Sequence, residues 1–478
     1  MEEKKKIEFY GGGWVSFLPF LIFLVVTLYI SFLKAPDVRG MWIGALGGII
    51  ITYFLAKDKD AYAKVVIDGM ADPIAIVPVA CWIFAGAFAS VLRSSKLVEG
   101  IIWAAYHLGA QGTVFVIVTF LACCIFSTAT GTGFGTIVAG MSVLYPAGVF
   151  LGANPLALIG AIVGGGAFGD NLAPVSDTTI CSAASQGADV GGVVRTRLKY
   201  SIAAGVTTLV LLAIFGGGGS VSNIPYETLQ TYMNPKGLIM LIPAAITIYV
   251  AVKKGDIIIA TTIGTVVASA FALLFDLADI NTLFFVKDGA VGGALVDGVA
   301  GMVDICILAL LVLSCVHIMK AGGGDKKMLD LAGIFVKTVR GAEASIAFLV
   351  ITMSTIMGLN APPILAVGTS FAKPIGEKFN IHPYRRANLL DATACTLVYS
   401  LPWTPSLLLT QSLAKEANKT FGSLVPVFNT VEMTPWIIYC WILLIVMIFA
   451  IVTGWGREYI GEDGRPVYYN PKSRAADF

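Results

Sequence analysis

Apolar runs long enough to cross a bilayer recur along the whole chain, and short polar segments separate them. This pattern predicts an all-α polytopic membrane protein. The expected crossings lie near residues 14–33, 41–55, 73–92, 155–183, 197–215, 237–252, 257–275, 303–319, 386–415 and 434–454. Two further apolar stretches, 112–150 and 343–374, carry glycine- or proline-rich centres. We expect each of them to form a re-entrant hairpin that enters and leaves on the same side.

Two of the expected crossings are interrupted by polar residues. In 155–183 the interruption holds Asp170, Pro174 and Asp177, and in 386–415 it is Ser400–Pro405. Irregular backbone inside a membrane persists only where protein or a wet cavity surrounds it, and ionisable residues there mark functional sites. Paired broken helices are typical of secondary transporters, whose substrate sites they form.

The chain shows signs of internal duplication at an offset of about 229 residues. Val66–Met70 is similar to Leu295–Val299, and the same offset relates Gly131 to Asn360. Each half then holds five crossings, one of them broken, plus one hairpin. Because five is odd, the second half is inverted relative to the first. The predicted organisation is a first repeat 1–215, an external linker 216–236, a second repeat 237–456 and a cytoplasmic tail 457–478.

The distribution of basic residues gives an orientation. With the N-terminus inside, the inner segments hold 24 Lys and Arg residues and the outer segments hold 8. This bias follows the positive-inside rule. It predicts a multi-pass protein of the cell (inner) membrane with both termini in the cytoplasm.

Composition narrows the function classes further. Hydrophobic residues make up 57% of the chain, which leaves no segment long enough for a soluble catalytic domain. The net charge of +2 predicts no nucleic-acid partner, and the eight cysteines show neither metal spacing nor a disulfide framework. No His-Glu-x-x-His motif is present. Ala167 breaks the Gly-x-Gly-Asp pattern of intramembrane aspartyl proteases. We therefore expect a protein that is not an enzyme and needs no cofactor.

The centre of the first hairpin is rich in glycine and hydroxyl groups. Ser127, Thr130 and Thr132 are its candidate binding residues. Their hydroxyls, together with freed backbone carbonyls, are hard oxygen donors suited to Na+ or to the hydrogen bonds of a carboxylate. The alternative is that these small residues only let helices pack closely.

The first broken helix offers two kinds of site. Asp170 and Asn171 lie at the end of its first half, where a helix favours cations, and Ser176, Asp177 and Thr178 begin its second half, where a helix favours anions. Structural alternatives remain for three of them. Asp177 could be a plain N-cap, Asp170 could make a structural hydrogen bond, and Asn171 could bridge the break.

The second half supplies three more candidates. Asn360 lies at the hairpin tip, Thr404 in the break, and Asp391 on the helix before that break. Asp391 is interpreted either as a proton or cation carrier or as the ion-pair partner of the nearby Arg385 or Arg386.

Three motifs together resemble the NhaC-type Na+/H+ antiporter family, within the ion-transporter superfamily that has paired re-entrant hairpins. They are Gly131–Thr136, Phe168–Thr179 and the set Arg386, Asp391, Pro402 and Trp403. The resemblance covers most of the chain. It implies that the ion and substrate positions include Thr130, Thr132, Asp170, Ser176, Asp177, Thr178 and Asp391. The chain departs from the family where it has Phe134, Leu390 and Thr404 in place of the usual Trp, Glu and Asn.

The leading hypothesis is therefore Na+/H+ antiport by alternating access. Na+, the coupling ion, would compete with H+ for the metal-binding aspartates Asp170, Asp177 and Asp391. The alternative is a Na+-coupled transporter or exchanger of a small organic acid or amino acid. For that alternative we expect no buried Arg or Lys at the site, which disfavours di- and tricarboxylates. The expected partners are the lipid bilayer, Na+ and H+, and the small-residue helix faces are compatible with a homodimer.

Overall fold

A computed structural model describes residues 7–32, 38–174, 176–217, 226–254, 256–287, 289–324, 327 and 336–471. The first six residues, much of the predicted linker 216–236 and the end of the predicted tail 457–478 lie outside the described residues. In the first half the elements are η1 Gly13–Phe17, α1 Leu18–Phe32, α2 Val38–Leu55, α3 Lys59–Ala71, α4 Pro73–Ser94, α5 Leu97–His107, α6 Thr113–Thr130, α7 Gly133–Ala139, η2 Gly140–Leu144, α8 Tyr145–Phe150, α9 Pro155–Leu172, α10 Asp177–Gln186 and α11 Val190–Phe215.

The second half repeats much of this order and adds two short β-hairpins. Its elements are α12 Tyr226–Thr231, η3 Pro235–Met240, α13 Leu241–Lys254, α14 Ile257–Leu274, α15 Ile280–Leu283, β1 Phe285–Lys287, β2 Ala290–Gly292, α16 Ala294–Ala300, α17 Val303–Ala321, α19 Val339–Met357, α20 Ala361–Val367, η4 Gly368–Ala372, α21 Lys373–Lys378, α22 Pro383–Ser400, α23 Pro405–Phe421, η5 Gly422–Leu424, α24 Thr430–Met433, η6 Thr434–Trp436, α25 Ile438–Thr453, β3 Tyr459–Ile460 and β4 Pro466–Val467. Both strand pairs are antiparallel.

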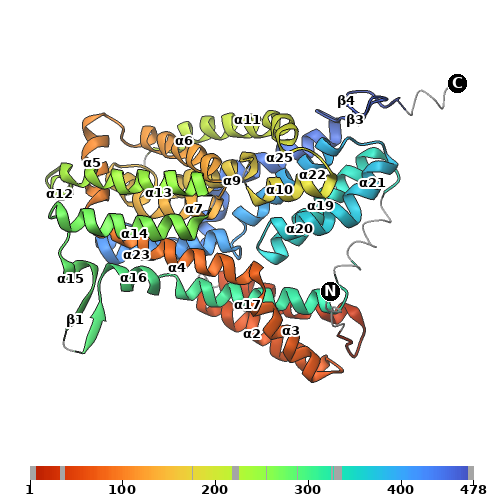
Figure 1. The fold of residues 1–478 in the computed structure, drawn as a ribbon, viewed down its shortest axis with the longest axis horizontal. Coiled ribbons are helices and arrows are strands. Elements are labelled where there is room, and N and C mark those ends of the chain that lie inside the picture. The colour runs from red at the N-terminus through yellow and green to blue at the C-terminus, as the bar shows by residue number, and fades with distance from the viewer. Residues whose placement is uncertain are drawn as a thin grey trace.

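The fold is mostly helical, as expected from the apolar pattern. In the described part of the chain, eight helices are long and apolar enough to cross a membrane, or up to ten if each of two bent helix pairs is one span. The protein is therefore a multi-pass membrane protein. In Figure 1 both ends of the chain lie in the right half of the view, whereas α5, α12 and the β1–β2 hairpin lie at the opposite end.

Five consecutive elements recur with constant spacing. The elements α7, η2, α8, α9 and α10 begin at 133, 140, 145, 155 and 177, and α20, η4, α21, α22 and α23 begin at 361, 368, 373, 383 and 405. The spacing is 228 residues in every case. Both η2 and η4 are π-helical, and π-helical turns of this kind are rare. The two halves therefore share local geometry as well as sequence.

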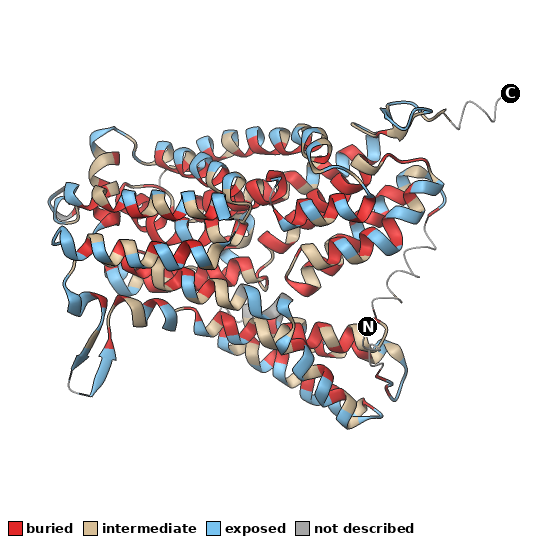
Figure 2. Ribbon diagram, in the orientation of Figure 1, coloured by how far each residue is buried: buried red, intermediate tan, exposed pale blue. Residues whose placement is uncertain are grey.

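Burial separates a central group of helices from a lipid-facing shell (Figure 2). In the most apolar window of the span Pro155–Gln186, 89% of residues are buried, compared with 28% for Ile257–Leu274. The outward faces of the peripheral helices carry large exposed apolar side chains such as Ile214, Val266 and Ile448. Exposed apolar residues on helices of this composition are expected to contact lipid rather than water. The interrupted helix α9–α10 therefore lies at the centre of the protein.

The helix α11 begins earlier than the expected crossing 197–215. Asp189 caps it by accepting a hydrogen bond from Gly192 N at 2.7 Å, so the first turn forms at Val190. Arg197 consequently lies inside the helix and is fully buried, although the charge pattern had placed it in a cytoplasmic segment. The helix therefore begins two turns earlier than expected, and Arg197 is part of the protein interior.

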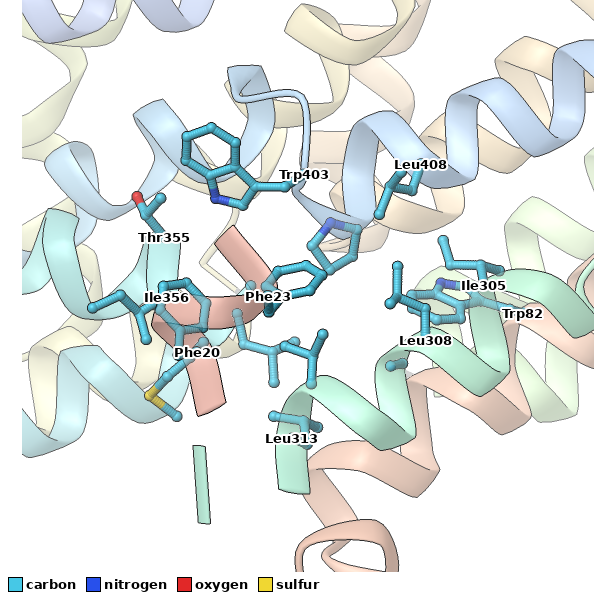
Figure 3. Close-up of a pocket in the computed structure, with 16 residues that line it drawn as sticks. Phe20, Phe23, Trp82, Ile305, Leu308, Leu313, Thr355, Ile356, Trp403 and Leu408 are labelled. Atoms are coloured by element: carbon cyan, nitrogen blue, oxygen red, sulfur yellow. The ribbon is translucent and has the colours of Figure 1, made fainter. Parts of the chain in front are cut away.

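The second hairpin and the second break border a small apolar cavity of about 30 Å³ (Figure 3). Its walls come from α1, α4, α17, α19 and α23 and include Phe23, Trp82, Leu308, Thr355 and Trp403. A space of this size holds about one water molecule, and its lining is almost entirely apolar. It is a packing gap rather than a binding site.

Candidate functional site

The break between α9 and α10 places a carboxylate at the centre of the protein. Helix α9 ends at Leu172, Ala173 is extended, and the Ser176 side chain caps α10 by accepting from Thr178 N at 3.3 Å. The Thr178 hydroxyl donates to the carbonyl of Asp170 at 3.1 Å. This hydrogen bond connects the end of α9 to the start of α10 across the break, next to the Asp170 side chain.

Asp170 is buried and hydrogen-bonded only to neutral groups. Its Oδ1 accepts from the Ser176 hydroxyl at 2.9 Å, and its Oδ2 accepts from the Tyr399 hydroxyl at 2.8 Å. The Cys395 thiol lies 3.9 Å from Oδ2. Among the described residues, no basic side chain pairs with Asp170. Its charge is therefore not compensated by the protein.

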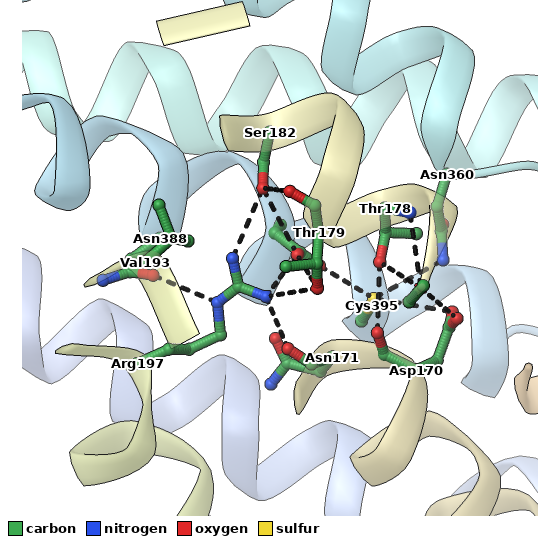
Figure 4. Close-up of polar contacts among 12 residues, drawn as sticks. Asp170, Asn171, Thr178, Thr179, Ser182, Val193, Arg197, Asn360, Asn388 and Cys395 are labelled. Carbon is green, nitrogen blue, oxygen red and sulfur yellow. Dashed lines mark hydrogen bonds and ion pairs between the residues drawn. The ribbon is translucent and has the colours of Figure 1, made fainter. Parts of the chain in front are cut away.

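Asp391 is the contrasting case. It is fully buried and forms an ion pair with Arg197, which is also fully buried. Figure 4 shows the Arg197 guanidinium among Thr179, Ser182 and Asn171. Thr179 donates to Asp391 Oδ2 at 3.2 Å, and Arg197 Nη1 lies 3.1 Å from the same Thr179 hydroxyl. Arg197 Nε also donates to Asn388 Oδ1 at 3.0 Å, and Nη1 donates to the carbonyl of Asn171. The Asp391 charge is thus matched by a cation within the protein.

This pair corrects two expectations from the sequence. The site was expected to hold no buried Arg or Lys, and that expectation was wrong because Arg197 lies in it. Under the ion-pair alternative, the partner of Asp391 was expected to be Arg385 or Arg386. In the structure Arg385 pairs with Glu343 at 2.8 Å, and Arg386 donates to the carbonyl of Lys373 at 2.9 Å.

Helix geometry explains the correction. Arg386 and Arg385 precede Asp391 by five and six residues on α22, which turns them roughly 140° and 240° away from it around the helix axis. Arg197 reaches Asp391 from the separate helix α11, which packs beside α22.

Cys395 joins the two carboxylates. Its thiol lies 3.5 Å from Asp391 Oδ1, 3.9 Å from Asp170 Oδ2 and 3.5 Å from Asn360 Nδ2. Its backbone, with φ −78° and ψ 20°, departs from helical values and kinks α22 at this point. The predicted residues Asp170, Asn360 and Asp391 therefore meet around one thiol, although they come from three separate elements.

The hydroxyls of the first hairpin tip do not face these carboxylates. Ser127 donates to the Gly166 carbonyl at 2.7 Å, Thr130 donates to the Phe126 carbonyl at 2.9 Å, and Thr132 caps α7 by accepting from Gly135 N at 3.2 Å. All three are satisfied by backbone groups. A binding role for these three residues stays a prediction.

Three other candidates also have local roles or point elsewhere. Asn171 Nδ2 donates to the Ser201 hydroxyl at 2.9 Å, while its buried Oδ1 has no hydrogen-bond partner. Thr404 donates to the Leu401 carbonyl at 2.7 Å and so closes the second break. Asp177 is exposed at the start of α10.

The metal-binding role expected for Asp170, Asp177 and Asp391 stays a prediction. Within the described ranges, no group of three His, Cys, Asp or Glu side chains could hold a metal ion. A cation near Asp170 would instead meet the hydroxyls of Ser176 and Thr178 and backbone carbonyls at the end of α9, which are neutral oxygen donors. Such a donor set suits a monovalent cation better than a structural metal ion.

Several residues of the site carried no signal in the apolar pattern. The sequence pattern gave no reason to distinguish Tyr399, Cys395, Thr179 and Ser182 from other helix residues. It placed Arg197 in a cytoplasmic segment. One signal was available for Tyr399. It lies 229 residues after Asp170, which is the repeat offset, so the two are near-equivalent positions of the two halves.

Comparison with known proteins gives a consistent assignment. The family model described as "Na+/H+ antiporter family" matches residues 11–217. The malate-2H+/Na+-lactate antiporter of Bacillus subtilis is 34% identical over 35% of this chain and 37% of its own length. A Haemophilus influenzae protein described as an uncharacterised Na+/H+ antiporter is 25% identical over 73% of this chain and 76% of its own.

The Na+/H+ antiporter NhaC of Alkalihalophilus pseudofirmus is 32% identical over 23% of this chain and 23% of its own length. The chain therefore matches well under two thirds of the length of the first and third of these relatives. The family match and the three relatives nevertheless agree with the motif resemblance. The first half of the chain is therefore similar to the Na+/H+ antiporter family, in agreement with the NhaC-type resemblance of its motifs.

Proposed function

We propose that this protein is a Na+/H+ antiporter in which Asp170 alternately carries Na+ and a proton. The observation that carries the proposal is the difference between its two central carboxylates. Asp391 has Arg197 as a fixed internal cation, whereas Asp170 has only neutral partners. A buried carboxylate without a matched charge is costly, so it takes up a cation or a proton. Exchange of the two at Asp170 is antiport.

The surroundings of Asp170 suit Na+. The residue lies in the last turn of α9, where the free carbonyls of a helix end favour a cation. The hydroxyl oxygens of Ser176 and Thr178 are further neutral ligands within the same break. Tyr399 stabilises the ionised form by hydrogen bonding, and the same hydroxyl can accept a hydrogen bond once Asp170 is protonated.

Alternating access would come from two inverted repeats. The constant spacing of 228 residues between five elements, and the matched π-helical turns, support the repeat assignment. On this proposal α6–α8 and α19–α21 are the re-entrant hairpins, and the α9–α10 and α22–α23 breaks form the site between the repeats. The basic-residue bias supports cytoplasmic termini in the cell (inner) membrane and an external β1–β2 hairpin. The homodimer stays a prediction.

The test is reconstitution of the full chain in liposomes that contain a pH-sensitive dye. A Na+ gradient should drive proton movement in the absence of any organic solute, and Asp170→Asn should abolish it. Asp279→Asn is the control, because Asp279 is an exposed aspartate at the N-cap of α15, outside the break. Proton movement that persists in Asp170→Asn would remove Asp170 from the transport site.

A second candidate function is exchange of a small organic acid coupled to Na+. The specific observation that favours it is Arg197, a buried guanidinium beside the site with hydrogen bonds to Asn388 and Thr179. Arginine recognises carboxylates well, and the Bacillus subtilis relative is described as a malate–lactate antiporter. Under this function Na+ alone would drive no proton flux, and labelled malate or lactate would enter only with Na+ present.

A further inference from the structure

A second polar cavity lies away from the central site. Its volume is about 390 Å³, and its walls come from the end of α4, the α15–β1 segment, the start of α16 and the end of α23. These elements gather at the end of the molecule that carries the β1–β2 hairpin, opposite the chain termini (Figure 1). The cavity is much larger than the apolar gap beside Trp403, and charged and hydroxyl side chains line it.

The wall of this cavity holds a buried arginine without hydrogen bonds. Arg93 is 4% exposed, and its Nε and Nη1 atoms have no hydrogen-bond partner. Within the described residues it also forms no ion pair. A guanidinium removed from water without partners carries a large desolvation cost. The third guanidinium nitrogen, Nη2, is not among these buried unsatisfied atoms, so it is the Arg93 donor that a ligand in the cavity can reach.

The acidic residues nearby identify what kind of ligand fits. Asp297 and Glu416 are the acids that interact electrostatically with Arg93. Glu416 is already paired with Lys419 at 2.6 Å. Asp297 is exposed toward solvent, and no partner for its carboxylate lies among the described residues. One cation and one anion therefore remain unpaired in the same cavity.

We propose that this cavity binds a small zwitterion with a carboxylate and an ammonium group, the chemistry of an α-amino acid. Arg93 would bind the carboxylate through the N–H groups of Nη2, and Asp297 would bind the ammonium group. Ser90 on α4 adds a hydroxyl to the same wall, whereas the Ser94 hydroxyl donates to the Ser90 carbonyl at 3.0 Å. A simple carboxylate fits less well, because Asp297 and Glu416 would repel it while Asp297 stayed unpaired.

The close packing of the walls supports a preformed site. A Cβ on Gly86 would lie 2.5 Å from the Gly298 carbonyl, and a Cβ on Gly298 would lie 2.8 Å from Ser90 Cβ. The helices α4 and α16 therefore meet at backbone distance just beside the cavity. This contact fixes the positions from which Arg93 and Asp297 project.

The test is ligand-dependent thermal unfolding of the purified full chain at a fixed Na+ concentration. The probes are L-alanine, propionate, which lacks the ammonium group, and ethylamine, which lacks the carboxylate. Only L-alanine should raise the unfolding temperature in a saturable way. Arg93→Gln should weaken its apparent affinity by about 30-fold or more, the effect of removing one partner of a buried charged hydrogen bond. Asp297→Asn should weaken it by up to about fivefold, because Asp297 is exposed.

Three controls distinguish binding in this cavity from binding elsewhere and from misfolding. Lys419→Gln changes a 70% exposed charge at the rim and should leave affinity within about threefold, as expected for an exposed ion pair. Asp170→Asn should keep L-alanine binding, because the central site is separate. Without ligand, Arg93→Gln should be at least as stable as the parent, since it removes an unpaired buried charge. Arg93→Lys serves as the second variant if Arg93→Gln does not fold.

Several results would overturn the proposal. Equal stabilisation by propionate and L-alanine, with no effect of Asp297→Asn, would show a plain anion site. Loss of L-alanine binding in Asp170→Asn but not in Arg93→Gln would move the ligand to the central site. Absence of stabilisation by every probe would show that the cavity holds only water.

Discussion

The ion pair between Arg197 and Asp391 allows the sharpest energetic prediction. Both side chains are fully buried, so Asp391→Asn leaves a guanidinium in the protein interior without its counter-charge. Breaking a buried pair in this way costs about 3–5 kcal/mol in the free energy of unfolding. Arg197 keeps acceptors at Asn388 and Thr179. We therefore expect the lower end, about 3 kcal/mol, or roughly a 100-fold change in the folding equilibrium.

The double variant separates the pair from other effects. Arg197→Gln combined with Asp391→Asn removes both charges and should regain at least about half of the stability that Asp391→Asn loses, or about 1.5 kcal/mol. Arg386→Gln is the matched control because its guanidinium bonds the Lys373 carbonyl instead. Combined with Asp391→Asn, it should be additive within about 0.5 kcal/mol.

The assay is equilibrium unfolding of the purified protein by sodium dodecyl sulphate in mixed micelles, followed by circular dichroism. The reasoning would be refuted if Asp391→Asn were as mild as Asp177→Asn, which alters an exposed aspartate. It would also be refuted if Arg386→Gln rescued Asp391→Asn and Arg197→Gln did not.

Three further predictions concern two local contacts and the membrane orientation. Gly133→Ala places a Cβ 2.1 Å from the Tyr399 hydroxyl, so it should displace that ring from Asp170, reduce transport and lower the free energy of unfolding by about 1–3 kcal/mol. Gly47→Ala is the control, because a Cβ there has no atom within 4 Å, and it should have neither effect. Equal transport by the two variants would contradict this prediction. Glu343 accepts from Arg385 at 2.8 Å and from Arg457 at 2.7 Å, so Glu343→Gln should lower the free energy of unfolding by detergent by about 3–5 kcal/mol. Glu377→Gln alters an exposed carboxylate and should lower it by only about 0–1 kcal/mol. In whole cells an impermeant thiol reagent should label Val286→Cys, in β1, from outside and should not label Tyr468→Cys; the reverse pattern would invert the proposed orientation.

Much of the helical arrangement could be predicted from sequence because a bilayer imposes its own length scale on apolar runs. The breaks at Pro174 and Pro402 were visible for the same reason, since polar groups there interrupt runs of known length. The offset between halves, read from short matches, agrees with the spacing of 228 residues between element starts to within one residue.

The partners within the site could not be predicted in the same way. Pairing of Arg197 with Asp391 depends on the Asp189 cap that starts α11 early and on α11 packing beside α22. Neither leaves a periodic signal in one sequence. The tip hydroxyls of Ser127, Thr130 and Thr132 looked functional because hydroxyl-rich tips can bind ions. Whether a hydroxyl bonds its own backbone is decided by local geometry.

Binding of radioactive Na+ to the purified protein tests the central claim most directly, because it requires no transport cycle. The claim is that Asp170 carries the ion and that Asp391 is held by Arg197. Saturable Na+ binding should therefore disappear in Asp170→Asn, remain in Asp279→Asn, and remain in the double variant Arg197→Gln/Asp391→Asn. Saturable binding that survives in Asp170→Asn, or that is lost in the double variant while the protein stays folded, would contradict the account.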